Sequence, residues 1–289
     1  MRITAIVSMY NPQVNDIDNI IRISKLVDRI IVFDNSYKNY EEKFLNRNLK
    51  YIANLDNIGL SKGYNNVLDN TMYEWEDDEF VIFFDQDSSV EFDHIEKLKE
   101  IYNLLEKSGF NVGCLGPSYY NEVTKKMEMV HGQEVSKGIY RVASIITSSM
   151  LTKYKVLKDI GFFNENIFID YVDWDLCWRM KYCNLECFTT DIIHIKHNVG
   201  IDTKKIGNLR LRVWRPIRTY YQVRDGRYLL RQSYVPLMKR FQLIYMIYLL
   251  PLLNLIFIDN RCQRFQFMRY GLRDSQKGIS GKFIEEQNR

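Results

Sequence analysis

Short apolar runs alternate with amphipathic segments over roughly the first third of the chain. Residues 2–10, 29–33, 49–53 and 80–84 are rich in apolar β-formers, as expected for strands buried inside a parallel sheet. Between the first two runs, the apolar positions of residues 15–26 recur at helical spacing and form one broad face. A strand, a helix and a strand of these lengths form a βαβ unit with a right-handed crossover. The pattern therefore predicts an α/β domain with a mostly parallel central sheet.

The pattern continues less regularly beyond this region. Residues 112–119 and 140–147 predict further strands, and residues 148–157 predict the start of a helix. Another helix is expected from about Val172. It would set Asp175 and Arg179 four residues apart, where their side chains can pair.

Two carboxylates follow one of the most apolar strands without a spacer. Asp85 and Asp87 would lie at the C-terminal end of that strand, where open α/β sheets place their ligands. Their hard oxygens suit Mg²⁺ or Mn²⁺, with substrate phosphates completing the coordination shell. An acidic turn that caps a helix near residues 94–107 is a second interpretation. A calcium loop is a third, and it is disfavoured because Val90 stands where that loop needs Gly.

Three earlier strands also end at Asp or Asn. Asn11, Asp34 and Asn54 directly follow their apolar runs. Each of these residues alone is more typical of a turn or a helix cap. Together with the Asp85 pair they form an array at one edge of the predicted sheet, and such an array can bind a nucleotide.

Composition narrows the class of protein. A chain of 289 residues with 46% hydrophobic residues can hold one large α/β domain and an appendage. Its five cysteines form no CxxC pair, which indicates a reducing compartment and argues against a structural zinc site. Cys183 and Cys187 are interpreted as two buried positions of one segment. The N-terminal sequence lacks the pattern of a signal peptide, so we expect a cytoplasmic protein.

The C-terminal part differs in kind from the rest, and we expect a division into residues 1–200 and 201–289. Residues 201–240 carry eleven Lys or Arg against two acidic residues, although the net charge of the chain is only +4. This asymmetry predicts an anionic partner or surface. Residues 241–258 are nearly all apolar but contain Pro251. They predict an interfacial or re-entrant helix, with a spanning helix and a helix packed on the core as alternatives.

Several sequence blocks together resemble one family. They are IVSMYNP, FDNS, NLDNIGLSKGYN, FFDQDS, IITSS, GFFNENIFIDYVDWDLCWR and HIKHNVG, in this order over about residues 1–230. They are similar to the inverting glycosyltransferase family two, and within it to the rhamnosyltransferase-like branch. The resemblance implies an α/β fold of the GT-A type in residues 1–200, a nucleotide-sugar donor, and Mn²⁺ or Mg²⁺ as cofactor. Residues 201–289 would then form a basic, largely helical region for contact with the membrane and the acceptor.

The resemblance also implies roles for individual residues. Asp173 matches the general base of the family, and His197 matches a ligand of the metal or the diphosphate. Asp85 and Asp87 would contact the ribose, the diphosphate and the metal. The nucleobase and ribose would be held by Tyr10, Asn11, Asp34, Asn57, Gly59 and Lys62.

Two positions depart from the family pattern. Ser149 follows Ser148 where the family has Gly, and Asp225 follows Arg224 where it has Asn. We expect these departures to affect details of acceptor binding rather than the chemistry.

The function expected from these features is transfer of rhamnose from dTDP-rhamnose to a lipid-linked saccharide acceptor in cell-surface polysaccharide synthesis. A galactofuranosyl or hexosyl donor carried by UDP is an alternative. Two other classes are a nucleotidyltransferase and a catalytically silent saccharide-binding module. The sequence predicts peripheral contact with the inner face of the plasma membrane, is compatible with a homodimer, and predicts no nucleic-acid partner.

Overall fold

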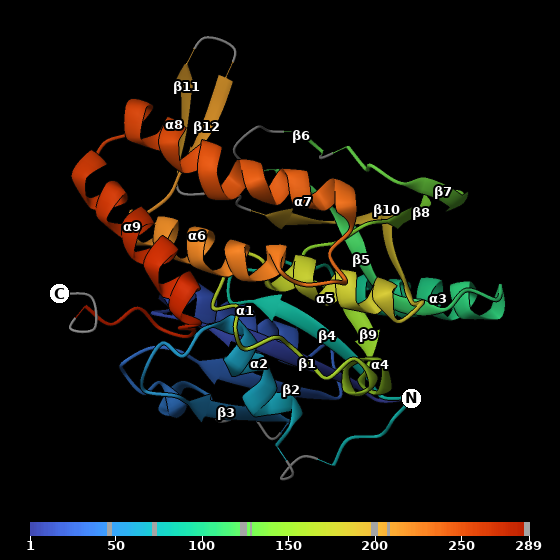
Figure 1. Cartoon of the computed structure of the whole chain (residues 1–289). Helices are drawn as coiled ribbons and strands as arrows, with labels where there is room; N and C mark the ends of the chain where they lie inside the picture. Colours follow the sequence, from blue (N-terminus) through green and yellow to red (C-terminus); the bar gives the residue numbers. More distant parts are fainter. Residues whose placement is uncertain are drawn as a thin grey trace.

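A mixed β-sheet runs through the centre of the molecule (Figure 1). The computed structural model describes residues 1–44, 48–70, 74–121, 126–127, 129–197, 202–206 and 209–285, with the backbone alone for residues 121, 126, 196–197, 202–206 and 209–212. In these residues ten strands form the sheet, in the order β3-β2-β1-β4-β9-β5-β10-β8-β7, with β6 paired to β5. The strands are β1 (Ile3–Met9), β2 (Arg29–Asp34), β3 (Leu49–Ala53), β4 (Phe80–Asp85), β5 (Val112–Asn121), β6 (Lys126–Met127), β7 (Gln133–Ser136), β8 (Ile139–Val142), β9 (Leu151–Lys153) and β10 (Glu186–His197).

The first four strands confirm the predicted parallel core. β1 pairs in parallel with β2 and β4, and β2 pairs in parallel with β3. Helix α1 (Val14–Ser24) buries Ile20 and Ile23 against one face, and α2 (Leu60–Leu68) buries Tyr64 and Val67 against the other. Both faces of these strands are therefore buried from solvent, which explains their unbroken apolar runs.

The middle of the sheet differs from the prediction for residues 140–157. The expected strand ends early, at Val142, and the expected helix begins only at Tyr154, as the short α4 (Tyr154–Asp159). Between them lies the three-residue strand β9 (Leu151–Lys153), antiparallel to both β4 and β5, which begins with Leu151 and Thr152. Both residues are fully buried. Pairing on both sides overrides the helical pattern here.

Other helices were predicted well. Helix α3 (His94–Lys107) has the expected bounds, and α5 (Val172–Tyr182) begins where expected. Arg179 Nε lies 2.7 Å from Asp175 Oδ2, which confirms the predicted i,i+4 pair. A short 3₁₀ turn, η1 (Glu41–Lys43), precedes β3.

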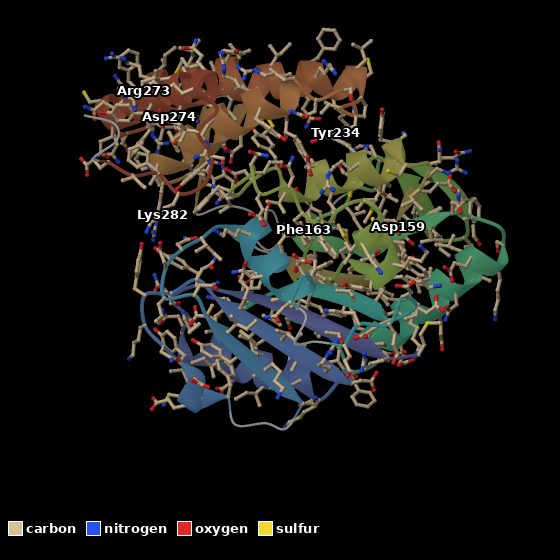
Figure 2. The ribbon with its side chains drawn as sticks, turned by 60° about the horizontal axis from the view of Figure 1, so that its bottom comes forward. Asp159, Phe163, Tyr234, Arg273, Asp274 and Lys282 are labelled. Carbon is tan, nitrogen blue, oxygen red and sulfur yellow. The ribbon has the colours of Figure 1, made fainter. Side chains whose placement is uncertain are left out.

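The C-terminal helices form a layer over α5, on the far side from β1–β3 (Figures 1 and 2). They are α6 (Ile217–Leu230), α7 (Leu237–Ile244), the π-helical η2 (Tyr245–Leu249), α8 (Leu250–Phe257) and α9 (Arg261–Lys277), and the hairpin β11 (Asp202–Ile206) and β12 (Leu209–Val213) precedes them. Val223, Leu229 and Ile247 join the same core cluster as residues of α5. The predicted division at residue 200 stays a prediction, because residues 198–201 lie outside the described part of the chain.

The apolar segment predicted at 241–258 lies in one continuous helix. Residues Leu237–Phe257 are long and apolar enough to cross a membrane, and only 22% of their most apolar stretch is buried. The π turn sits just before Pro251. Proline lacks an amide donor and its ring clashes with the carbonyl four residues earlier, here that of Ile247. The wider π turn accommodates the proline without a break in the helix.

Several basic residues of 201–240 bind groups within the protein, contrary to the expectation of an external anion. Arg218, Arg224 and Arg227 bind Asp170, Asp225 and the Tyr248 hydroxyl. Arg231 donates to the Ser275 carbonyl, and Arg240 donates to three carbonyls near the end of α6. Five of the eleven basic residues therefore hold the helices together. The expectation that the whole region needs an external anion is wrong for these five.

One buried carboxylate connects this helical layer to the sheet domain. Asp225 is fully buried, and its two oxygens accept from Arg224 Nε at 2.6 Å and from the backbone amide of Phe168 at 2.9 Å. Burial raises the pKa of Asp225 to about 6, while the charge of Arg224 acts against that shift. The segment before α5 is thus tied to α6 by a charged, desolvated contact.

Asp225→Ala should destabilise the fold by about 3–5 kcal/mol in urea unfolding, because it leaves the Arg224 charge buried without its partner. Asp225→Asn keeps an oxygen for the Phe168 amide and should cost less. Asp159→Ala removes an exposed carboxylate 2.8 Å from Lys155 and is the control, with an expected loss below about 1 kcal/mol. Equal losses for the two alanine variants would contradict this role of Asp225.

Candidate functional site

A cleft opens at the C-terminal ends of β1, β2 and β4. Its volume is about 330 Å³, and we call it the Asp85 cleft. It contains the edge at which the sequence predicted a nucleotide site. Its lining residues are Ser8, Met9, Tyr10, Asn35, Asn57, Gly59, Leu60, Asp85, Gln86, Asp87, Phe168 and Ile169.

The two carboxylates of the motif face this cleft from a tight turn. Ser88 donates its amide to the Asp85 carbonyl at 3.0 Å and accepts the Asp85 amide at its hydroxyl at 2.9 Å. Ser8 Oγ donates to Asp85 Oδ1 at 3.1 Å, and Asp87 is exposed. Helix α3 starts only at His94, with Asp93 at its N-cap. The interpretation of Asp85 and Asp87 as helix caps is therefore wrong.

The opposite wall of the cleft is set by a close backbone approach. Gly59 has φ +90°, and a Cβ there would lie 2.7 Å from the ring of Phe168. The Leu60 amide donates to the Phe168 carbonyl at 2.9 Å, and the Asn57 side chain accepts the Gly59 amide at 3.1 Å. Gly59 is thus required for the loop to meet the segment that α6 holds.

The C-terminal segment also reaches back to the rim of the cleft. Lys282 extends from beyond α9 toward the N-terminal half of the molecule (Figure 2), where it pairs with Asp56 beside Asn57. The Tyr221 hydroxyl accepts the Phe283 amide at 3.1 Å and anchors this segment to α6.

Asp173 lies in a neighbouring cavity rather than in the Asp85 cleft. This Asp173 cavity has a volume of about 280 Å³, and its lining includes Ser118, His131, Trp174 and Lys239. The Trp174 amide donates to Asp173 Oδ1 at 2.9 Å. Burial, and to a smaller extent the thiol of Cys177 one turn later, raise the pKa of Asp173 to about 8. Such a carboxyl can exchange a proton near neutral pH, as a general base must.

Tyr64 connects the two sites. Its side chain is buried, and its hydroxyl shares a hydrogen bond with Ser8. Burial first, and then the charges of Asp85 and Asp173, raise the pKa of Tyr64 well above its ordinary value. The charges of both carboxylates thus act on one buried tyrosine. The segment from Phe168 to Asp173 also runs from the lining of the Asp85 cleft to that of the Asp173 cavity.

The other predicted site residues divide into two groups. Tyr10, Asn57 and Gly59 line the Asp85 cleft, whereas Asn11 and Lys62 are exposed outside its lining. Asp34 is fully buried, and its oxygens accept from the Ser36 amide and the Tyr51 hydroxyl at 2.8 and 2.6 Å. The side chain of His197 lies outside the described residues. The roles assigned to all these residues stay predictions.

Sequence reasoning missed several residues of the site. Ser8, Gln86 and Phe168 were not singled out, although all three lie in blocks that carried the resemblance. The Gln86 side-chain oxygen accepts the Tyr10 amide at 2.7 Å and its nitrogen donates to Asp16 at 2.9 Å, so it fixes the turn after β1. The position of Gln86 between Asp85 and Asp87 was the one feature of the sequence that could have indicated its place in the site.

Ser149, one of the two departures from the expected family pattern, is held in an unusual backbone conformation by its contacts. Ser149 has φ +64°, a conformation that favours glycine. His94 Nε2 lies 2.6 Å from Ser149 Oγ, and the Ser149 amide donates to the Phe83 carbonyl at 2.7 Å. These contacts hold a serine where the family has Gly, directly behind the Asp85 turn.

Solved structures with similar folds identify the type of fold. The chain superposes on S. aureus TarS with a TM-score of 0.58 and 15% identity over 96% of this chain. It superposes on GalNAc-T7, in a crystal structure with UDP, GalNAc and Mn²⁺, with a TM-score of 0.52 and 11% identity over 84% of this chain. It spans about half the length of either protein, 49% and 54%. The fold is the one that glycosyltransferases of the GT-A type have.

A sequence relative narrows this class. The chain is distantly homologous to the dTDP-rhamnosyl transferase RfbF of Shigella flexneri, with 26% identity over 254 residues that cover 82% of each protein. A scan against protein-family models finds no match. The expected fold class, including the C-terminal helices, is confirmed.

The residues of the Asp85 cleft fit a hard divalent cation. Asp85 and Asp87 offer carboxylate oxygens from one turn, and Asp87 is open to solvent. None of the described residues that line the cleft offers a thiol or an imidazole. This donor set suits Mg²⁺ or Mn²⁺ that shares its remaining positions with phosphate oxygens.

Asp173→Asn should stabilise the protein increasingly as the pH rises from about 5 to about 8. Since burial raises the pKa of Asp173, its contribution to stability is complete below the unfolded value of about 4 and is lost as the pH rises through the folded value. The asparagine variant lacks this loss. Tm measured across the pH range tests this, with Asp159→Asn as the control for removal of one carboxylate. A constant difference in Tm between the Asp173→Asn variant and the wild type would contradict the assignment.

Proposed function

We propose that this glycosyltransferase transfers rhamnose from dTDP-rhamnose, with inversion, to a saccharide acceptor on a lipid carrier in cell-surface polysaccharide synthesis. The observation that carries the proposal is a pair of sites on one segment, a carboxylate-lined cleft that Ile169 lines and, four residues later, the half-buried carboxyl of Asp173, whose pKa is about 8. The distant homology to the rhamnosyl transferase RfbF supports the donor.

The donor would lie along the Asp85 cleft. Its nucleoside would lie toward Tyr10, Asn35 and Asn57, and its diphosphate toward Asp85 and Asp87. A divalent cation, when bound, would offset the charge that develops on the departing diphosphate. Phe168 and Ile169 close the other wall with apolar surface. Such a wall excludes water from the diphosphate and strengthens the electrostatic contacts.

The acceptor would enter from the Asp173 cavity. Asp173 would take the proton of the attacking hydroxyl while the bond between the sugar and the diphosphate breaks on the opposite face of the sugar. One displacement of this kind inverts the anomeric centre without a covalent intermediate. Trp174, half-buried in the same cavity, offers an aromatic face for a sugar ring.

The lipid carrier would be met by the long C-terminal helix. Phe241, Tyr245, Leu249, Leu252 and Ile256 recur at helical spacing and are all exposed. Large exposed apolar stripes of this kind mark interaction surfaces. A helix with one apolar face and basic neighbours suits the interface of an anionic membrane.

Basic residues outside the helical core supply the charge that this surface needs. The hairpin β11–β12 carries Lys204, Lys205, Arg210 and Arg212 in its sequence. Arg264 of α9 donates to the carbonyl of Trp214 at 2.7 Å, so the base of the hairpin lies against α9. Each such residue near an anionic leaflet contributes about 1 kcal/mol.

Asp173→Asn should lower nucleotide release from dTDP-rhamnose by about 10²- to 10⁴-fold, because a general base acts only in the transition state. Donor affinity by calorimetry should stay within about threefold of the wild type.

Asp87→Ala should instead weaken donor binding, and the remaining donor affinity should no longer depend on Mn²⁺.

Glu91→Ala is the matched control for Asp87, since Glu91 is exposed on the same loop but does not line the Asp85 cleft. Wild-type turnover in the Asp173→Asn variant would remove this residue from the mechanism. If a chelator does not change the donor affinity of the wild-type protein, no metal ion takes part in donor binding.

A variant with Phe241, Leu249 and Ile256 all changed to Gln should lose co-sedimentation with anionic vesicles but keep nucleotide release. These side chains are 63, 51 and 57% exposed, so their replacement should leave the core intact. Leu104→Gln replaces a side chain that is 50% exposed on α3 and should sediment like the wild type. Sedimentation of the triple variant equal to that of the wild type would reject the membrane surface.

A further inference from the structure

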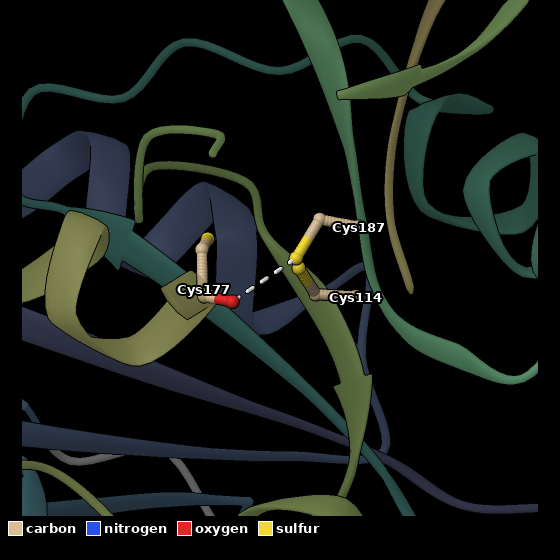
Figure 3. A group of neighbouring side chains, drawn as sticks. All are labelled: Cys114, Cys177 and Cys187. Atoms are coloured by element: carbon tan, nitrogen blue, oxygen red, sulfur yellow. Dashed lines mark hydrogen bonds between the residues drawn. The ribbon is translucent and has the colours of Figure 1, made fainter. Parts of the chain in front are cut away.

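Three cysteine sulfurs meet in the core of the protein (Figure 3). Cys114 lies on β5, Cys177 on α5 and Cys187 on β10. All three are buried, and their sulfurs lie within 4.8 Å of one another. Cys114 and Cys187 are direct partners in the parallel pairing of their strands. Three separate elements thus bring sulfur to one point.

The three thiols make only weak hydrogen bonds with the described residues around them. Cys187 Sγ lies 3.8 Å from the Cys177 carbonyl, and Cys177 Sγ lies 3.9 Å from the Ile145 carbonyl. Both contacts are long even for sulfur donors. Each thiol also forms hydrogen bonds with the other two thiols. A cluster held only by such weak bonds has sulfur lone pairs free for a stronger ligand.

The spacing fits one ion bound by three sulfurs. An ion at a metal–sulfur distance of about 2.3 Å from each would set the sulfurs roughly 4 Å apart. The observed upper limit of 4.8 Å allows this with small side-chain movements. No carboxylate or imidazole belongs to the cluster among the described residues. Sulfur alone selects soft ions and disfavours the hard cations that suit the Asp85 cleft.

A route from solvent leads to this cluster. Cys187 lines a cavity of about 760 Å³ together with His131, Arg141 and Lys181. Three thiolates around a divalent ion carry one net negative charge, and Lys181, one turn after Cys177 on α5, supplies a nearby positive charge. The cluster therefore has both an entry path and charge compensation.

We propose that Cys114, Cys177 and Cys187 form a trigonal binding site for a soft divalent d¹⁰ metal ion. Binding releases the thiol protons to solvent and forms three metal–sulfur bonds, with no change of oxidation state. The site is separate from the proposed function, because none of its ligands lines the Asp85 cleft.

Cadmium is the probe, since thiolate ligands to Cd²⁺ give a charge-transfer band in the ultraviolet and carboxylate ligands do not. The full chain carrying Cys183→Ala and Cys262→Ala serves as background, because these two cysteines are exposed and lie outside the cluster. Titrated with Cd²⁺ under a thiol-free reductant, this background protein should bind one equivalent with the charge-transfer band and a raised Tm. Cys114→Ala or Cys187→Ala, added separately, should abolish the band.

X-ray absorption on the cadmium-loaded background protein provides a test that needs no cluster variant. Three sulfur neighbours are expected. Oxygen or nitrogen in the first shell, absence of the band in the background protein, or a band that survives loss of Cys114 and of Cys187 would overturn the site.

Discussion

The buried carboxylate of Asp225 is the contact on which the geometry of both sites depends. It joins α6, through the Phe168 amide, to the segment that runs into α5. Phe168 in turn accepts the Leu60 amide and meets Gly59 at van der Waals distance. Four residues after Phe168 the backbone reaches α5, and the next residue is Asp173. The position of the Phe168 wall and that of Asp173 therefore both depend on this desolvated ion pair.

This arrangement explains why the C-terminal helices belong to the catalytic unit. Arg218 binds Asp170, Tyr221 stacks on Phe168 with ring centroids 4.4 Å apart, and the Tyr234 hydroxyl donates to Asp175. Arginines that look like a charged surface in the sequence thus position the segment between the two sites. In the described part of these helices, the outer stripe of the long helix stays exposed.

The sequence predicted the parallel strands and the Asp85 turn because their signals are local. A strand that is buried on both faces has an unbroken apolar sequence, and polar residues mark the point where it ends. The strand β9 was missed because three residues paired on both sides carry no periodicity of their own. Phe168 was missed as a wall of the cleft because its contact with Gly59 spans more than 100 residues of sequence. The cysteine cluster was hidden for the same reason, and the expectation that Cys183 is buried like Cys187 was wrong, since Cys183 is exposed after α5.

The central claim is that donor and metal bind in the Asp85 cleft with the sugar directed toward Asp173. A crystal structure with dTDP and Mn²⁺, using anomalous scattering to locate manganese, tests it most directly. The account predicts manganese in contact with Asp87 and the diphosphate, and the thymidine beside Tyr10 and Asn35. Nucleotide and manganese bound instead in the cavity beside Arg141 and His131, with the Asp85 cleft unchanged, would contradict it.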